Sequence, residues 1–192
     1  MLREITLVAF MLCSLLFVGC ATTQHAAGDA APSAEGDAPV SESITTQYIM
    51  GESIQTSPDG ATPFGPPIQV RGMRKINTAE GTIIERSWHQ GKHYTSLKTR
   101  RGDTNTFELS DEGNTYSGTV TFASEDWARA SMTYDIKMND GSGTLTGTGS
   151  WEGDRYMTHK IFSDPTGTPQ VRIVDNLKLV TKEAFEAAGA AE

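Results

Sequence analysis

The segment from Ala128 to Trp151 alternates apolar with polar or small residues on both sides of Asp140-Gly141. Asp-Gly is a preferred pair for the type I′ turn of a β-hairpin. With these two residues as the loop, apolar residues fall on one face and hydroxyl or charged residues on the other, as a half-buried antiparallel pair requires. This register directs Tyr134 and Trp151 into a core. The predicted apolar pairs are Ile136 with Leu145, Tyr134 with Gly147, Met132 with Gly149 and Ala130 with Trp151, and the polar pairs are Lys137 with Thr144, Asp135 with Thr146, Thr133 with Thr148 and Ser131 with Ser150.

Short alternating segments separated by turn dipeptides recur along the rest of the chain. Such regular spacing predicts an all-β antiparallel fold, either an up-and-down barrel or an open two-sheet sandwich. No segment before residue 181 has a helical apolar stripe, so parallel βαβ units are not expected. The expected strands are Ile68–Lys75, Thr82–His89, Lys92–Thr99, Thr104–Leu109, Asn114–Phe122, Ala128–Met138, Gly143–Trp151, Arg155–Phe162 and Val171–Val180.

A short helix is predicted after the last strand, from about residue 181. Thr181 is a suitable N-cap, and Glu183 complements the positive end of the helix dipole. Phe185 is its apolar anchor, and Gly189 ends it. Residues 44–192 are therefore expected to form one barrel domain with this helix at its C-terminal end.

The C-terminal half of the chain resembles a known bacterial family. A Gly-rich alternating strand that ends in Trp151, a return strand, a Gly-containing turn and a final strand leading into Thr181-x-Glu183-x-Phe185 are similar to bacterial lipocalin-like (calycin-type) domains of unknown function. The resemblance covers about residues 68–186. It implies an antiparallel barrel with a short flanking helix. The family has no established catalytic residues, and none are carried over.

The first residues have the organisation of a secretory signal. Arg3 is followed by an apolar run from Ile5 to Val18, which is shorter than the ~20 residues of a membrane-spanning helix. Val18-Gly19-Cys20 resembles the bacterial lipobox, with Phe17 where the family prefers Leu. This resemblance implies that residues 1–19 are removed as a signal peptide, that Cys20 is lipidated, and that the mature chain is anchored to a membrane. Ala21 after the cysteine implies the outer membrane, facing the periplasm, as its location.

Residues 20–43 are rich in Ala, Gly, Ser, Pro and acidic residues and lack an apolar period, so we expect a disordered tether. The chain has 24 acidic and 16 basic residues and a net charge of −8. Such an acidic chain is not expected to bind nucleic acid.

Catalytic and metal-binding patterns are not found. No Gly-x-Ser-x-Gly elbow is present, and the Gly143-to-Gly149 repeat lies in a strand rather than before a helix. His89 and His93 flank a predicted Gln90-Gly91 hairpin loop, so that His89 faces Lys92 and His93 faces Trp88, on opposite faces of the sheet. We therefore expect no enzyme activity, no metal and no cofactor.

The orientation of His159 depends on the loop that follows Trp151. A three-residue loop directs His159 inward with Met157 and Ile161, whereas a shorter loop directs it outward and places Tyr156 inside.

A binding module is the favoured function. The candidate ligand-lining residues are Trp88, Phe107, Tyr116, Phe122, Tyr134, Trp151 and His159. Small barrels either fill their interior or keep a ligand cavity. The first hypothesis is a small apolar or amphipathic ligand in the barrel. The alternative is a filled barrel, structural in role, whose outer surface meets a protein partner that the sequence does not identify.

Overall fold

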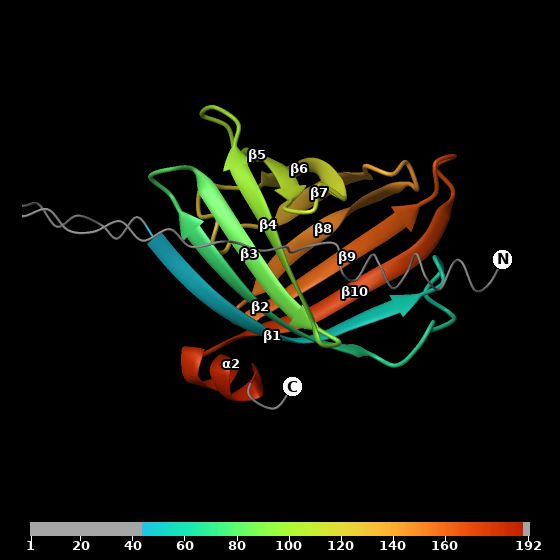
Figure 1. The fold of residues 1–192 in the computed structure, drawn as a ribbon, viewed down its shortest axis with the longest axis horizontal. Helices are drawn as coiled ribbons and strands as arrows, with labels where there is room; N and C mark the ends of the chain where they lie inside the picture. Colours follow the sequence, from blue (N-terminus) through green and yellow to red (C-terminus); the bar gives the residue numbers. More distant parts are fainter. Residues whose placement is uncertain (1–43, 190–192) are drawn as a thin grey trace, which may run out of the picture.

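The computed structural model describes residues 44–189, which form a closed antiparallel β-barrel with one short helix (Figure 1). Neighbouring strands along the chain pair with each other, and β1 pairs with β10 to close the barrel. The up-and-down barrel is thus confirmed and the open sandwich is excluded. The strands are β1 (Ile44–Thr56), β2 (Ile68–Asn77), β3 (Thr82–His89), β4 (Lys92–Arg100), β5 (Thr106–Asp111), β6 (Tyr116–Phe122), β7 (Met132–Met138), β8 (Thr144–Glu152), β9 (Arg155–Ser163) and β10 (Pro169–Val180).

Strand β1 was not among the strands expected from the sequence. Its buried side chains, Gln47, Ile49 and Ser53, lie on one face, but two of the three are polar, so no apolar alternation marks the strand. Its partners β2 and β10 supply the backbone hydrogen bonds on both of its edges. Pairing, rather than the pattern of its own side chains, makes this segment a strand.

The register of the β7–β8 hairpin agrees with the prediction from Lys137–Thr144 through Met132–Gly149. The turn differs, because among its residues Gly141 has positive φ and Asp140 does not, which excludes the expected type I′ geometry. A four-residue connection (139–142) holds the same register. The amide of Gly141 donates to the carbonyl of Met138 (3.1 Å), and the amide of Met138 donates to the carbonyl of Gly143 (3.0 Å).

The expected pairs Ala130–Trp151 and Ser131–Ser150 are wrong, because β7 begins at Met132. Residues 123–131 instead leave the wall and cross one end of the barrel. The ring of Trp127 packs edge-on against Phe107 at 4.8 Å, and the carbonyl of Ala128 accepts a hydrogen bond from Gln47 of β1, on the opposite wall (3.0 Å). This segment closes that end of the barrel.

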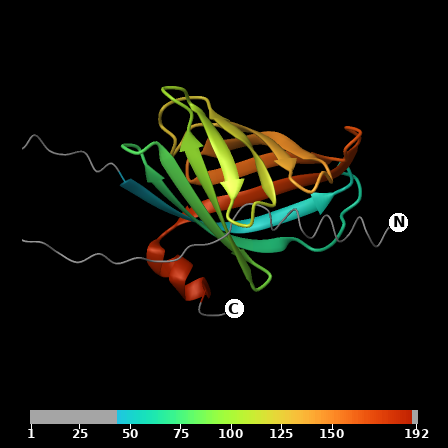
Figure 2. The same ribbon diagram turned by 45° about the horizontal axis from the view of Figure 1, so that its top comes forward.

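Helix α2 (Lys182–Gly189) lies outside the barrel and contacts β1 (Figure 2). The amide of Ala184 donates to the hydroxyl of Thr181 (3.3 Å), which confirms the predicted N-cap. Phe185 is buried between Tyr48 and Trp88, with ring centroids 5.2 and 5.4 Å away. Within the described residues, no helix has the length and apolar character needed to cross a membrane.

The predicted signal peptide (1–19), the lipidation site Cys20 and the tether (20–43) lie outside the described residues.

Candidate functional site

The interior of the barrel differs between two contiguous groups of strands. We call β5–β8 the apolar half and β9, β10 and β1–β4 the polar half. The buried charged side chains of the described residues belong to the polar half, apart from Asp111, which binds the turn after β5 through the amides of Thr115 and Tyr116. The fully buried apolar side chains of the apolar half are Phe107, Leu109, Tyr116, Val120, Phe122, Met132, Tyr134, Ile136, Met138 and Leu145.

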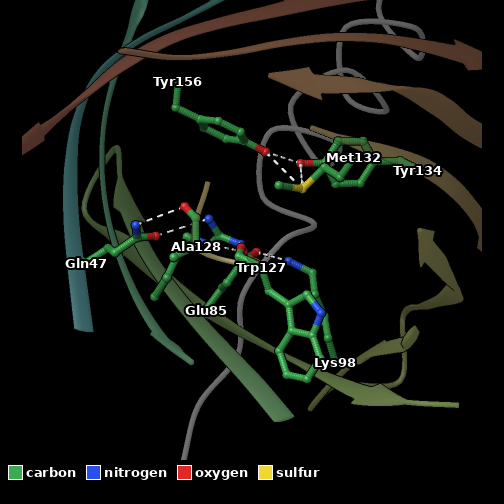
Figure 3. Close-up of polar contacts among 9 residues, drawn as sticks. Gln47, Glu85, Lys98, Trp127, Ala128, Met132, Tyr134 and Tyr156 are labelled. Atoms are coloured by element: carbon green, nitrogen blue, oxygen red, sulfur yellow. Dashed lines mark hydrogen bonds and ion pairs between the residues drawn. The ribbon is translucent and has the colours of Figure 1, made fainter. Parts of the chain in front are cut away.

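The first charged cluster joins β2, β3 and β4. Arg74 and Glu85 face each other directly in the β2–β3 register, and Nε of Arg74 donates to Oε1 of Glu85 at 2.7 Å. The other carboxylate oxygen of Glu85 forms an ion pair with Lys98, which is fully buried (Figure 3). Arg74 also donates to Oε1 of Gln47 (3.2 Å) and to the carbonyl of Trp127 (3.4 Å). Arg74 therefore ties the barrel wall to the segment that closes its end.

Burial opposes ionisation of Glu85, but Lys98 and Arg74 outweigh it and hold the pKa of this carboxyl below its ordinary value. Burial also opposes the charge on Arg74, and Glu85 reverses this, so the pKa of Arg74 is raised. For Lys98 burial dominates and lowers the pKa from 10.5 to about 8, because Glu85 offsets it only in part. At neutral pH the three side chains carry a net charge of +1.

The second charged cluster joins β9, β10 and β1. Nζ of Lys160 lies 2.6 Å from Oδ2 of Asp175. The hydroxyl of Thr158 donates to the same oxygen, and the hydroxyl of Ser53 donates to Oδ1, each at 2.6 Å. Burial disfavours the carboxylate of Asp175, yet Lys160 and the hydroxyl donors outweigh it and lower its pKa.

A pair of tyrosines lies beside the first cluster, with the guanidinium carbon of Arg74 6.0 Å from the centre of the Tyr156 ring. The hydroxyls of Tyr134 and Tyr156 are hydrogen-bonded to each other, and the hydroxyl of Tyr134 contacts the sulfur of Met132 at 3.1 Å (Figure 3). Burial raises the pKa of both tyrosines, so both are neutral hydroxyls at physiological pH. Gly149 makes room for Tyr156, since a Cβ at this glycine would lie 2.6 Å from the tyrosine hydroxyl.

These groups surround a cavity of about 60 Å³ inside the barrel. One part of its wall is aliphatic, and the other part carries the charged and hydroxyl groups. The aliphatic lining includes Ile49, Val70, Ile173 and Leu177, and the polar lining includes Ser53, Arg74, Glu85, Ser87, Tyr134, Tyr156, Thr158, Lys160 and Asp175.

Of the seven residues expected to line a ligand site, only Tyr134 lines this cavity. Phe107, Tyr116 and Phe122 point inward as predicted and are buried in the packed core of the apolar half. Trp151 is half-buried on the inward face, where its ring lies 4.9 Å from that of Tyr156.

Two of the seven residues do not point into the barrel. Trp88 points outward, because the inward face of β3 carries Ile83, Glu85 and Ser87. Trp88 packs instead against Phe185 of α2 and the guanidinium of Arg71. His159 is exposed, because Glu152 pairs with Arg155 and leaves a two-residue loop. The shorter-loop alternative is therefore the correct one, with Tyr156 inside.

The predicted hairpin at Gln90-Gly91 is confirmed, with both residues at positive φ and Trp88 opposite His93. His89 is buried and stacks on Tyr94 at 4.8 Å. Among the residues of the barrel and α2, no three His, Cys, Asp or Glu side chains are grouped so that they could hold a metal ion.

The charged interior was not predicted from the patterns of the single strands. Arg74, Glu85 and Lys160 each share a strand face with apolar residues, so each resembles an isolated exception. The detectable signal was the opposite charge of Arg74 and Glu85 at directly facing positions across the 78–81 turn. A register derived from that turn would have brought them together.

Searches with the whole chain against protein-family models and against curated proteins find no match.

Proposed function

We propose that this chain is a lipid-anchored envelope protein whose barrel binds a small amphipathic molecule. The proposed address, in the outer membrane and facing the periplasm, rests on the signal-like residues 1–19 and the lipobox-like Val18-Gly19-Cys20. Two or more acyl chains on Cys20 would give stable attachment, unlike a single chain.

The observation that carries the ligand proposal is the divided wall of the cavity. Aliphatic side chains such as Ile49 and Leu177 face the same space as Lys160 and Arg74. A wholly apolar ligand would bring no partner to the polar part of this wall, whereas an amphipathic one matches both parts. This favours the amphipathic member of the two ligand classes expected from the sequence.

The cavity volume limits which part of the ligand is enclosed. About 60 Å³ is well below the roughly 300 Å³ of sites that enclose a whole drug-sized molecule. It corresponds to about two water molecules, or to one polar group of similar size. The ligand is therefore a very small molecule, or a longer one that inserts only its polar end.

The same small volume favours a second candidate, a filled barrel that meets a protein partner through its outer surface. An open groove of about 370 Å³ on β6–β8 is one place for such contact. Its lining includes the hydroxyl residues Thr121, Thr133, Thr148 and Ser150.

Mass spectrometry of the full chain purified from bacterial membranes tests both parts of the first proposal. Denatured protein should lack residues 1–19 and carry acyl mass, and Cys20→Ser should lose that mass. Native spectra should show one small molecule per chain, distinct from the detergent. Ile173→Phe, which fills the cavity, should abolish this adduct, whereas the neighbouring outward substitution Val174→Phe should retain it.

An unlipidated mature chain would refute the address. Absence of any adduct from the wild-type protein, or equal adducts in the two phenylalanine variants, would refute ligand binding in the cavity and support the filled barrel.

A further inference from the structure

The polar part of the cavity wall has an excess of hydrogen-bond donors. All four carboxylate oxygens of Glu85 and Asp175 already accept contacts, from Arg74, Lys98, Ser53, Thr158 and Lys160. The cationic side chains of Arg74 and Lys160, in contrast, still have N–H groups that donate no hydrogen bond. Arg74 has five N–H groups and donates three of them, and Lys160 has three and donates one.

The hydroxyl of Ser87 adds another donor. Ser87 is 1% exposed, lines the cavity, and its Oγ has no hydrogen-bond partner among residues 44–189. A buried hydroxyl without a partner is unfavourable, and a bound acceptor would satisfy it.

The charge of the two clusters has the same sign as this donor excess. On the cavity wall Arg74 and Lys160 are matched by Glu85 and Asp175, and Lys98, which pairs with Glu85 but does not itself line the cavity, is a third cation, so the clusters together carry one more positive than negative charge. An excess of buried positive charge is costly, and an anion bound beside it reduces the cost.

We infer that the cavity holds an oxyanion, a carboxylate or a phosphate group, between Lys160 and Arg74, as the polar end of the ligand. This inference rests on the proposed function and specifies the class of molecule it binds. The group fits the volume of about 60 Å³, and the aliphatic side chains Ile49, Val70, Ile173 and Leu177 are placed to contact the carbon chain next to it.

Titration calorimetry on the full chain with two probes of equal chain length, hexanoate and 1-hexanol, tests the inference. We expect hexanoate to bind at least tenfold more tightly, because its carboxylate is charged and offers more acceptor sites to the unused donors than the hydroxyl of hexanol does. Acetate and inorganic phosphate, added as competitors, separate the two sources. Competition by acetate alone identifies a carboxylate site, and competition by phosphate alone identifies a phosphate site.

Variants at the second cluster give opposite expected results. Asp175→Asn removes a carboxylate next to Lys160 and should tighten hexanoate binding several-fold. Lys160→Met combined with Asp175→Asn removes the cation without leaving an unpaired carboxylate, and should abolish the preference for hexanoate over hexanol. Lys137→Met removes an outward lysine and should change nothing. Thermal unfolding verifies that each variant is folded.

The outcomes distinguish this inference from the function it rests on. Equal binding of hexanoate and hexanol, or weaker hexanoate binding by Asp175→Asn, overturns the oxyanion site and leaves amphipathic binding in place. Binding of acetate or phosphate that requires Lys160, without binding of either six-carbon probe, supports the oxyanion site and overturns the amphipathic ligand. Binding of none of the four probes overturns both.

Discussion

The apolar half and the polar half of the barrel have the same backbone architecture, but the polar half buries charged side chains among its apolar ones. In β5–β8 the inward side chains pack as an ordinary core, with Phe107 and Leu145 almost fully buried. Across the lumen, Arg74 and Lys98 are buried just as deeply and Glu85 nearly so, and their contacts with one another offset the cost of burying charge. The stability of the protein should therefore respond differently to substitutions in the two halves, and its dependence on pH should arise from the polar half.

The largest effect is expected from Glu85→Ala. This substitution leaves Arg74 and Lys98 buried without their carboxylate, a change that typically costs about 3–5 kcal/mol. Urea unfolding monitored by circular dichroism measures it. The control is the triple variant Arg74→Met, Glu85→Leu and Lys98→Met, which removes all three charges and should be as stable as wild type or more so. A triple variant as unstable as Glu85→Ala would contradict this account.

A somewhat smaller effect is expected in the apolar half from Leu145→Ala. Leu145 is 2% exposed and faces Ile136, so the truncation should lose about 3 kcal/mol through lost burial and the cavity left behind. The loss should be the same at pH 5 and pH 8, because the carboxylates nearest in the register, such as that of Asp135, point outward. The same unfolding experiment at both pH values measures it, and a pH-dependent loss would show that the two halves are coupled.

The smallest of the three effects is the pH dependence of wild-type stability. The pKa values of Glu85 and Asp175 are lowered in the folded state, so the unfolded chain binds more protons as pH falls through their ordinary values of 4.5 and 3.8. Their stabilisation is present above those values and lost below them. Between pH 7 and 4.5 only the beginning of this loss is reached.

Above neutral pH, the free energy of unfolding should also rise with pH. The pKa of Lys98 is about 8 in the folded protein against 10.5 ordinarily, so between these values the unfolded chain again binds more protons and stability should rise with pH. Unfolding free energies measured from pH 4.5 to 10 test both limbs. The triple variant should lose the alkaline rise and keep only the Asp175 part of the acid loss. An unchanged profile in that variant would exclude the cluster as its source.

The apolar half was the easier half to predict from the sequence. Between Met132 and Gly149 each inward position is apolar or glycine and each outward one polar, so the alternation and the turn position fixed the register correctly. The wrong turn type did not change the predicted register, because a four-residue connection and a two-residue connection give the same residue pairs here. Tyr134 was placed correctly for the same reason.

The interior of the polar half was harder to predict, because the same strand faces carry both charged and apolar side chains. In β3, Ile84 and Trp88 lie on the outward face while Glu85 and Ser87 lie inside, so the rule of apolar residues inward gave the wrong orientation. The apolar ring of Trp88 packs against Phe185 of α2, which lies nearly one hundred residues further along the chain. Only knowledge of cross-strand partners would have identified the interior ion pairs.

The seam between the first and last strands has a consequence for how the chain acquires its shape during synthesis. Until residue 180 has left the ribosome, the strand that begins at residue 44 has no partner on one side, and neither does the outermost strand already made. An unfinished chain thus exposes two strand edges with unpaired backbone N–H and C=O groups, and these can pair with any other extended peptide nearby. Truncation before β10 (Pro169–Val180) would make that hazard permanent.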